Sequence, residues 1–288
     1  MGGIAANNAS GMCCGTAANT YSTLRSMQLV LADGTLLDTA DESSCRAFEQ
    51  SHAALLDELS ILAQRVHDNP ALADRIRHKY RLKNTMGYAL NALLDFQRPL
   101  DILTHLMVGS EGTLGFIGEL VLDTVADHLH KATALLFFPS AQAACELVPQ
   151  LKAVASAVEL IDQRGLKAVA GHAAIPRQID LQNGGVTALL VEVDAANSLL
   201  LEDAVRAAQG VLSRSELLTP PEFSRDADLR ASLWALRKGL FPAVGAVRPL
   251  GTTVIIEDIA VPVAQLGAAV MQLQMLFQRY HYDDAVIF

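Results

Sequence analysis

The sequence lacks several features that mark specialised classes of protein. Its longest apolar runs fall short of the roughly 18–20 residues that a helix needs to cross a bilayer. No basic stretch followed by an apolar one opens the chain, as a secretory signal would. With 22 Lys and Arg against 31 Asp and Glu, the net charge is −9, which argues against nucleic acid as a partner. We therefore expect a cytoplasmic protein without a transmembrane segment.

Cysteine is also scarce. The four cysteines, Cys13, Cys14, Cys45 and Cys145, have no spacing typical of metal ligands. Reduced thiols are the usual state of such residues in the cytosol. We therefore predict no metal site and no iron–sulfur cluster. A third absence excludes a class of enzyme: the chain has no strand–GxGxxG–helix unit with an acidic residue downstream, which opposes a nicotinamide-binding fold.

The 288 residues suffice for one large or two ordinary domains. In the first part, the pattern predicts two strands around Asp33-Gly34 within 27–39, and apolar residues at helical spacing predict one helix over 44–67. A basic helical stretch over 71–82, a helix over 88–96 and a strand over 113–125 follow.

Near residue 128 the pattern changes to strands that alternate with helices. We predict strands over 134–138, 158–161, 186–193 and 252–259, helices over 141–156, 196–212, 225–240 and 262–280, and a loop over 171–185. Ser140 is the expected N-cap of the helix over 141–156. Such alternation suggests a ferredoxin-like α+β domain. We therefore predict two domains, 1–127 and 128–288.

Two glycine-rich segments are the most informative local feature. The first covers residues 2–11 (GGIAANNASG) and the second residues 108–117 (VGSEGTLGFI). Small residues let backbone turn tightly or approach another group closely, and exposed N–H groups in such turns can hold phosphate or ring oxygens. Together the segments suggest two walls of one nucleotide cleft.

These segments resemble the flavin domain of FAD-linked oxidases of the vanillyl-alcohol oxidase class, above all the D-lactate and D-2-hydroxyglutarate dehydrogenases. Further matches are the hairpin over 29–37, the loop over 83–88 (KNTMGY) and the element over 234–237 (WALR). The resemblance implies an α+β fold: the second half of an FAD-binding domain over 1–127, then a truncated ferredoxin-like substrate domain over 128–288.

The resemblance also implies that the chain is an internal piece of a longer enzyme. Relatives carry another flavin subdomain ahead of Gly2, with the loop that wraps the pyrophosphate, and a histidine-bearing segment after Phe288 that supplies the proton acceptor. His105 and His172 are poor substitutes, better explained as packed or exposed histidines. We therefore expect the chain alone to hold little FAD, to oxidise no hydroxyacid, and to associate, as a homo-oligomer, through strand edges left bare.

The implied reaction is dehydrogenation of a D-2-hydroxyacid, D-2-hydroxyglutarate or D-lactate, by hydride transfer to FAD, with an electron acceptor that the sequence does not specify. Such a substrate needs a carboxylate clamp, and the planar fork of arginine suits two oxygens. By the resemblance Arg237 takes that role; the alternative is a surface arginine paired with Asp228 or Glu222. Arg248 is a second candidate anion contact, with an ordinary loop arginine as the alternative.

The cofactor contacts implied by the resemblance lie in the two glycine-rich segments: Gly2, Gly3, Asn7, Asn8, Ser10, Gly11, Gly109, Ser110, Glu111, Gly112, Thr113, Gly115, Phe116 and Ile117. Asn and Ser also stabilise turns without any ligand, and Glu111 and Thr113 could simply hold the second turn. Tyr88 lies near the flavin ring or closes the core. The basic stretch over 71–82 is a solvated face, or leans toward the flavin phosphates.

A hypothesis of another class stays open. The chain could be a cofactor-free structural or interaction module. Flavin absorbance near about 450 nm separates this module from an FAD-dependent dehydrogenase.

Overall fold

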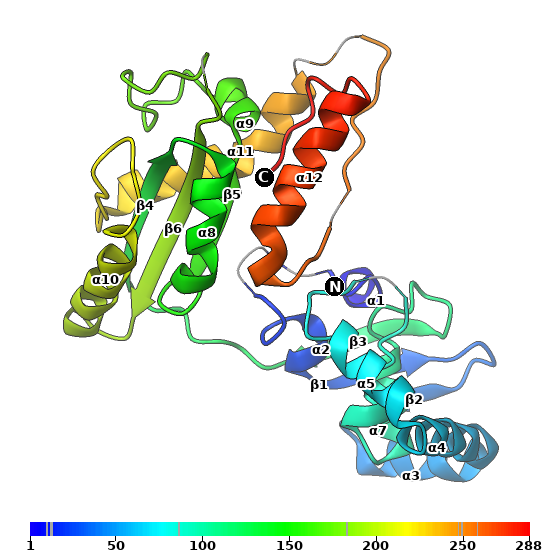
Figure 1. Ribbon diagram of the computed structural model, residues 1–288. Helices are drawn as coiled ribbons and strands as arrows, with labels where there is room; N and C mark the ends of the chain where they lie inside the picture. The colour runs from blue at the N-terminus through cyan, green and yellow to red at the C-terminus, as the bar shows by residue number, and fades with distance from the viewer. Residues whose placement is uncertain are drawn as a thin grey trace. The chain divides into compact units, whose positions relative to one another are not determined.

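The computed structural model describes residues 1–9, 11, 14–85, 87–182, 184–246, 248, 250–257 and 259–288. They form two compact units, Met1–Ala126 and Asp127–Phe288 (Figure 1). None of the described helices has the length and apolar character that crossing a membrane requires.

The first unit combines a three-stranded antiparallel sheet with short helices. The sheet has the order β2-β1-β3, formed by β1 (Leu24–Val30), β2 (Leu36–Asp38) and β3 (Phe116–Leu122). The helices are α1 (Gly2–Ala6), α2 (Thr20–Thr23), α3 (Glu42–Ser51), α4 (Ala53–His67), α5 (Pro70–Lys79), α6 (Ala92–Asp95) and α7 (Pro99–Leu106).

The hairpin between β1 and β2 follows its predicted turn. Asp33 Oδ1 accepts a hydrogen bond from Thr35 N at 2.9 Å, and Gly34 has φ of +86°, which glycine adopts at no steric cost. That hydrogen bond and a second one from His52 lower the pKa of Asp33 to about 2. The local sequence therefore determines this turn.

The predicted continuous helix over 44–67 is wrong, because the chain breaks at His52 between α3 and α4. His52 stacks on Phe48 with ring centroids 4.3 Å apart, and its Nε2 lies 3.0 Å from Asp33 Oδ2. These contacts hold His52 outside helical geometry although neither glycine nor proline is present. The helix expected over 88–96 is likewise reduced to α6.

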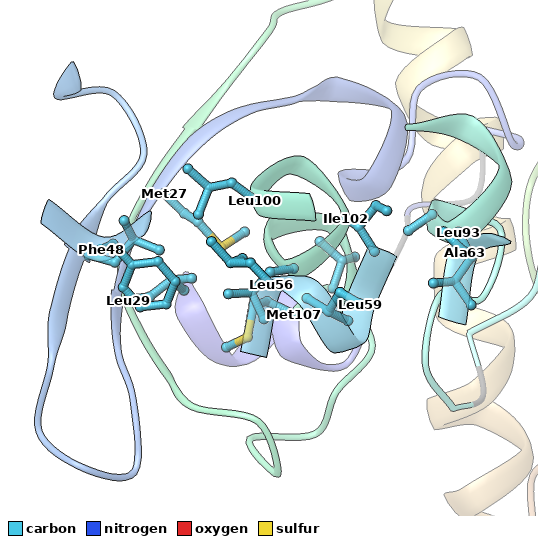
Figure 2. Close-up of a cluster of buried hydrophobic side chains, with 14 of the residues drawn as sticks. Met27, Leu29, Phe48, Leu56, Leu59, Ala63, Leu93, Leu100, Ile102 and Met107 are labelled. Atoms are coloured by element: carbon cyan, nitrogen blue, oxygen red, sulfur yellow. The ribbon is translucent and has the colours of Figure 1, made fainter. Parts of the chain in front are cut away.

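The core of the first unit lies between the sheet and the helices. Met27 and Leu29 of β1 meet Phe48 of α3, with side chains of α4 and α7 completing the cluster (Figure 2). The members labelled there are Met27, Leu29, Phe48, Leu56, Leu59, Ala63, Leu93, Leu100, Ile102 and Met107. This core fixes β1 and β3, and with them the chain that leads out of the second glycine-rich segment.

The second unit is built on another three-stranded antiparallel sheet, of order β4-β6-β5. Its strands are β4 (His130–Phe138), β5 (Ala157–Ile161) and β6 (Thr187–Ala195). The helices are α8 (Ala141–Leu151), α9 (Gln163–Ala168), α10 (Ser198–Leu212), α11 (Ala227–Ala246) and α12 (Leu266–Arg279), with a 3-10 turn over Val263–Gln265. Ser140 caps α8 as predicted, because its Oγ accepts from Ala143 N at 3.1 Å.

Helices cover both faces of this sheet. Leu136 and Leu189 face α8 and α10, whereas Phe137 and Ala188 on the opposite face meet α9 and α11. Strand side chains alternate between the faces, so Glu159 of β5 lies on the α11 face with Ile161. The outer surface of α8 packs against Val270 of α12.

The predicted strand over 252–259 is wrong for the residues described there. The outer edge of β4 carries an isolated bridge between Thr133 and Ser224 and a hydrogen bond from Leu218 N to Phe137 O at 2.8 Å. Between these two contacts lies a Pro220-Pro221 pair that has no N–H to donate. Beyond β5, the backbone of Ile287 pairs with Asp162, whose N lies 3.1 Å from Ile287 O. Both edges have other neighbours, and none of the described residues in 252–257 is part of a strand.

Candidate functional site

The first glycine-rich segment folds as α1 followed by a turn. Asn8 ends this turn in the left-handed region with φ of +52°, which asparagine tolerates better than most residues. Gly2 lies so close to β3 that a Cβ atom there would be 2.4 Å from Ile117 O. The smallness of Gly2 therefore serves helix-to-strand packing, and Ile117 is a core residue, 5% exposed.

The second glycine-rich segment lies directly against the first. Gly109 N donates to Ala5 O at 3.1 Å, and Glu111 N donates to Ala6 O at 2.9 Å. Gly109 has φ of +84°, and a Cβ atom there would be 2.8 Å from Gly87 O of the 83–88 loop. The structure thus brings together three segments that are far apart in the sequence.

Side chains of both segments hold this junction. Asn7 Nδ2 donates to Glu111 Oε1 at 2.8 Å, which supports Glu111 at its φ of +52°. Thr113 Oγ1 donates to Ser110 O at 2.6 Å and lies 2.8 Å from the hydroxyl of Tyr88. Glu111 and Thr113 therefore stabilise the second turn, and Tyr88, 43% exposed, ties the neighbouring loop to it.

The backbone amides of this turn are largely used within the protein. Besides Gly109 and Glu111, Ser110 N donates to Met107 O and Thr113 N to Ser110 O. Gly115 is packed too, since a Cβ atom there would be 3.0 Å from Val30 O. Open space remains beside Gly3, Gly11 and Gly112, and Phe116 is 69% exposed; Ser10 lies outside the described residues.

Several buried polar atoms of the first unit have no hydrogen-bond partner among the described residues. Asn8 Oδ1, Asn91 Oδ1 and Ser110 Oγ are buried and make no hydrogen bond to any described residue. Asn8 and Asn91 line a pocket of about 430 Å³ in the first unit. Buried polar groups are normally satisfied by protein, water or ligand, so a polar cofactor such as FAD suits this donor and acceptor set.

The same pocket is bordered by the basic helix. Arg77 and Arg81 line it, while both are exposed and Arg77 Nη1 lies 3.1 Å from Asp74 Oδ1. The stretch over 71–82 is thus a solvated face as predicted, with two of its guanidinium groups at the pocket. Tyr21 also lines the pocket, and its hydroxyl donates to Asp95 Oδ2 at 2.8 Å. Burial is the main cause that raises the pKa of Tyr21, and the neighbouring Asp95 carboxylate raises it further.

In the second unit, Arg237 lies on the face of α11 that meets the sheet. Its Nε donates to Glu159 Oε2 at 3.1 Å, and its Nη2 lies 3.0 Å from the same oxygen. The two side chains are only 11% and 14% exposed. Arg237 is therefore no surface arginine, and its partner is neither Asp228 nor Glu222.

An aromatic ring covers Arg237 as well. Its guanidinium carbon lies 4.8 Å from the ring centroid of Phe288. The C-terminal residues are held there because Asp162 Oδ2 accepts from Ile287 N at 3.0 Å and Oδ1 accepts from Gly165 N at 2.8 Å. Burial raises the pKa of Asp162, an effect that these hydrogen bonds oppose.

A second carboxylate anchors α11 one turn earlier. Glu192 Oε2 accepts from Trp234 Nε1 at 2.7 Å and from Thr133 Oγ1 at 2.7 Å. No motif in the sequence indicated Glu192 or Glu159 as functional residues. The only local signal was a charged residue inside an apolar strand, which is costly to bury without a partner.

The guanidinium of Arg248 donates hydrogen bonds to backbone carbonyl oxygens. Its Nε donates to Thr252 O at 2.9 Å, and its Nη1 donates to Gly245 O near the end of α11. These contacts match the alternative of an ordinary loop arginine. Its role as a second anion contact stays a prediction.

The two histidines considered in the sequence have structural partners. His105 stacks on Phe96 at 3.9 Å between ring centroids, Nδ1 lies 2.8 Å from Asp101 O, and burial lowers its pKa. His172 Nδ1 accepts from Ala174 N at 3.2 Å. Within the described residues no group of three His, Cys, Asp or Glu side chains could hold a metal ion.

Three curated proteins resemble this chain at low identity. Glycolate oxidase subunit GlcD of Bacillus subtilis (strain 168) is 25% identical over 181 residues, which cover 62% of this chain and 37% of that protein. Probable mitochondrial D-lactate dehydrogenase of Danio rerio is 24% identical, covering 94% and 44%. D-2-hydroxyglutarate dehydrogenase of Xanthomonas citri pv. viticola is 26% identical, covering 72% and 39%. The chain thus spans less than half the length of these relatives.

A solved structure shares the fold. Alkyldihydroxyacetonephosphate synthase matches 96% of this chain and 45% of its own length, with a TM-score of 0.57 and 15% identity. The family described as FAD linked oxidases, C-terminal domain, matches residues 128–288, which make up more than half of the chain. The chain therefore belongs to the FAD-linked oxidase family, as the motifs had indicated.

Proposed function

We propose that the protein containing this chain is an FAD-dependent dehydrogenase of D-2-hydroxyacids, with D-2-hydroxyglutarate or D-lactate as substrate. In this proposal residues 1–127 are the second part of an FAD-binding domain, and residues 128–288 form part of a ferredoxin-like substrate domain. The strand order β4-β6-β5, with Leu218 and Ser224 contacting the outer edge of β4, supports a βαββαβ arrangement whose fourth strand is reduced to these isolated contacts.

The observation that carries the proposal is the junction of the two glycine-rich segments. The contacts of Gly109 with Ala5 and of Glu111 with Ala6 hold the segments side by side, next to Asn8 Oδ1 and Ser110 Oγ, which have no hydrogen-bond partner among the described residues. Asn7, Gly3, Gly11 and the open side of the turn at Gly112 are the residues that we expect to border FAD, with Ser10 as a further candidate.

FAD, when bound, supplies the hydride acceptor. The chain's own task is to orient the substrate. Arg237 is proposed to bind the substrate carboxylate, since a guanidinium fork matches two carboxylate oxygens and its buried setting strengthens the pair. The relatives named as D-lactate dehydrogenase, D-2-hydroxyglutarate dehydrogenase and glycolate oxidase subunit all carry 2-hydroxyacids in their names, which supports this substrate class.

One observation favours the alternative of a cofactor-free module. The amides of residues 109, 110, 111 and 113 all donate within the protein, so the turn is satisfied without a ligand. The alternatives differ in one simple property. The dehydrogenase binds FAD, whereas the module does not.

The test uses the full-length protein. Purified in native form, it is expected to show flavin absorbance near about 450 nm and to reduce a dye acceptor with a D-2-hydroxyacid. Arg237→Ala is expected to keep the flavin and to lose turnover at low substrate. A colourless protein that binds no added FAD would instead support the module.

A further inference from the structure

We propose that Glu159 is a positioning residue for the substrate carboxylate: it fixes the orientation of Arg237 so that one defined edge of the guanidinium is presented to the substrate. The inference rests on the proposed function of Arg237. It assigns a role to a residue of β5 that no sequence motif indicated.

The contact geometry separates two edges of the guanidinium. Nε and Nη2 of Arg237 both point at Glu159 Oε2, at 3.1 and 3.0 Å. These two nitrogens form the side edge of the group. The end edge, formed by Nη1 with the second N–H of Nη2, makes no hydrogen bond to the described residues. Arginine has five N–H donors, and this end edge is the one that we expect to bind the two oxygens of a carboxylate.

The plane of the guanidinium is fixed as well as its edge. The ring of Phe288 covers one face at 4.8 Å, and only 11% of the side chain is exposed. A long arginine side chain otherwise loses considerable rotamer freedom when it binds a ligand. Glu159 and Phe288 already hold the Arg237 side chain in one conformation before the substrate binds. Substrate binding therefore costs little further side-chain entropy at Arg237.

The charge of Glu159 works against binding of an anionic substrate. The buried pair is neutral overall, so a substrate anion gains less attraction than it would from an unpaired guanidinium. Removing Glu159 therefore has two opposite effects on substrate binding. It leaves the positive charge of Arg237 unpaired, which favours an anion, and it removes the contact that fixes the orientation of the guanidinium, which disfavours binding. A glutamine keeps an acceptor oxygen for Nε and Nη2 but loses the charge, so comparison of alanine with glutamine isolates orientation.

A purely structural role is the competing explanation, since Glu159 also ties α11 to the sheet. Glu192 provides the matched control. It lies on the neighbouring strand, on the same face, and holds the same helix through Trp234 at 2.7 Å. The hydrogen bonds of Glu192 go to Thr133 and Trp234 and not to Arg237, so its replacement tests helix docking without disturbing the contacts of the guanidinium.

The experiment measures KM and kcat per bound flavin in the full-length holoenzyme, with D-lactate and D-2-hydroxyglutarate as probes. Glu159→Ala is expected to raise KM about tenfold or more and to lower kcat, because a misplaced clamp loses orientation. Glu159→Gln should recover most of this loss. Glu192→Ala should lower the melting temperature at least as much while KM changes less than about threefold.

The inference is overturned if the alanine and glutamine variants of Glu159 have the same KM, or if Glu192→Ala raises KM as much as Glu159→Ala does. If Glu159→Ala does not fold, Glu159→Asp replaces it: the carboxylate is retained one methylene further back, and KM should rise although the charge is kept. A failure of the proposed function looks different, because Arg237→Ala would then leave KM unchanged.

Discussion

Replacing Gly109 by alanine is expected to destabilise the first unit by roughly 2–4 kcal/mol. The backbone at Gly109 has φ of +84°, and an L-residue in the left-handed region costs about 1–2 kcal/mol. Reduced freedom of the unfolded chain returns about 0.4–1 kcal/mol. The new Cβ would lie 2.8 Å from Gly87 O, and relieving such an overlap adds about 1–3 kcal/mol.

Gly112→Ala is the matched control. Gly112 has φ of +75° but nothing lies within 4 Å of a Cβ there, so only the backbone cost of about 0.5–1 kcal/mol remains. Urea unfolding followed by far-ultraviolet circular dichroism measures both variants. The fluorescence of Trp234, the only tryptophan, reports the second unit as an internal reference. Equal losses in the two variants would refute the argument from contact with Gly87.

Three further predictions concern single side chains. In the holoenzyme, Arg237→Ala should lower kcat/KM for the D-2-hydroxyacid by the equivalent of roughly 2–4 kcal/mol while the bound flavin is retained. Arg237→Lys should recover only part of the lost kcat/KM. Loss of flavin with unchanged kcat/KM per flavin would mark Arg237 as structural. Because burial lowers the pKa of His105, the unfolded state binds the proton more readily, so stability should fall as pH drops below about 6.5. His105→Phe should reduce that dependence in urea titrations at neutral and mildly acid pH, and identical slopes would contradict this. Burial raises the pKa of the Cys145 thiol to about 11, so iodoacetamide should label it only after unfolding, and rapid labelling of the native protein, read by mass spectrometry, would disprove its burial.

The sequence predicts best where local chemistry decides. The Asp33-Gly34 turn and the Ser140 cap each depend on hydrogen bonds within three residues, so a single segment contains the information. The composition of the two glycine-rich segments led us to expect them in one place, and backbone contacts between α1 and the 109–113 turn show that they are neighbours. The nucleotide cleft between them stays a prediction.

The remaining errors arise from contacts between distant segments. Arg237 and Glu159 are 78 positions apart, so no spacing rule could choose Glu159 over the nearby Asp228 or Glu222. The break at His52 depends on Asp33, 19 positions earlier. The β-branched stretch over 252–257 has good strand propensity, yet propensity does not form a strand without an edge to pair with. The roles of Arg237 and of the glycine-rich residues toward ligands stay predictions.

Reduction of the bound flavin by a hydroxyacid is the step that defines a D-2-hydroxyacid dehydrogenase, and it can be measured by itself. The full-length protein is mixed without oxygen with D-2-hydroxyglutarate or D-lactate, and separately with the L-enantiomers, while flavin absorbance near about 450 nm is followed. We expect a D-enantiomer to bleach the flavin at a rate that saturates with substrate concentration, and its L-enantiomer to cause no bleaching. In Arg237→Ala the substrate concentration that gives half the maximal rate should be at least about tenfold higher. A flavin that none of these acids reduces, or a protein that binds no flavin, would contradict the proposed function.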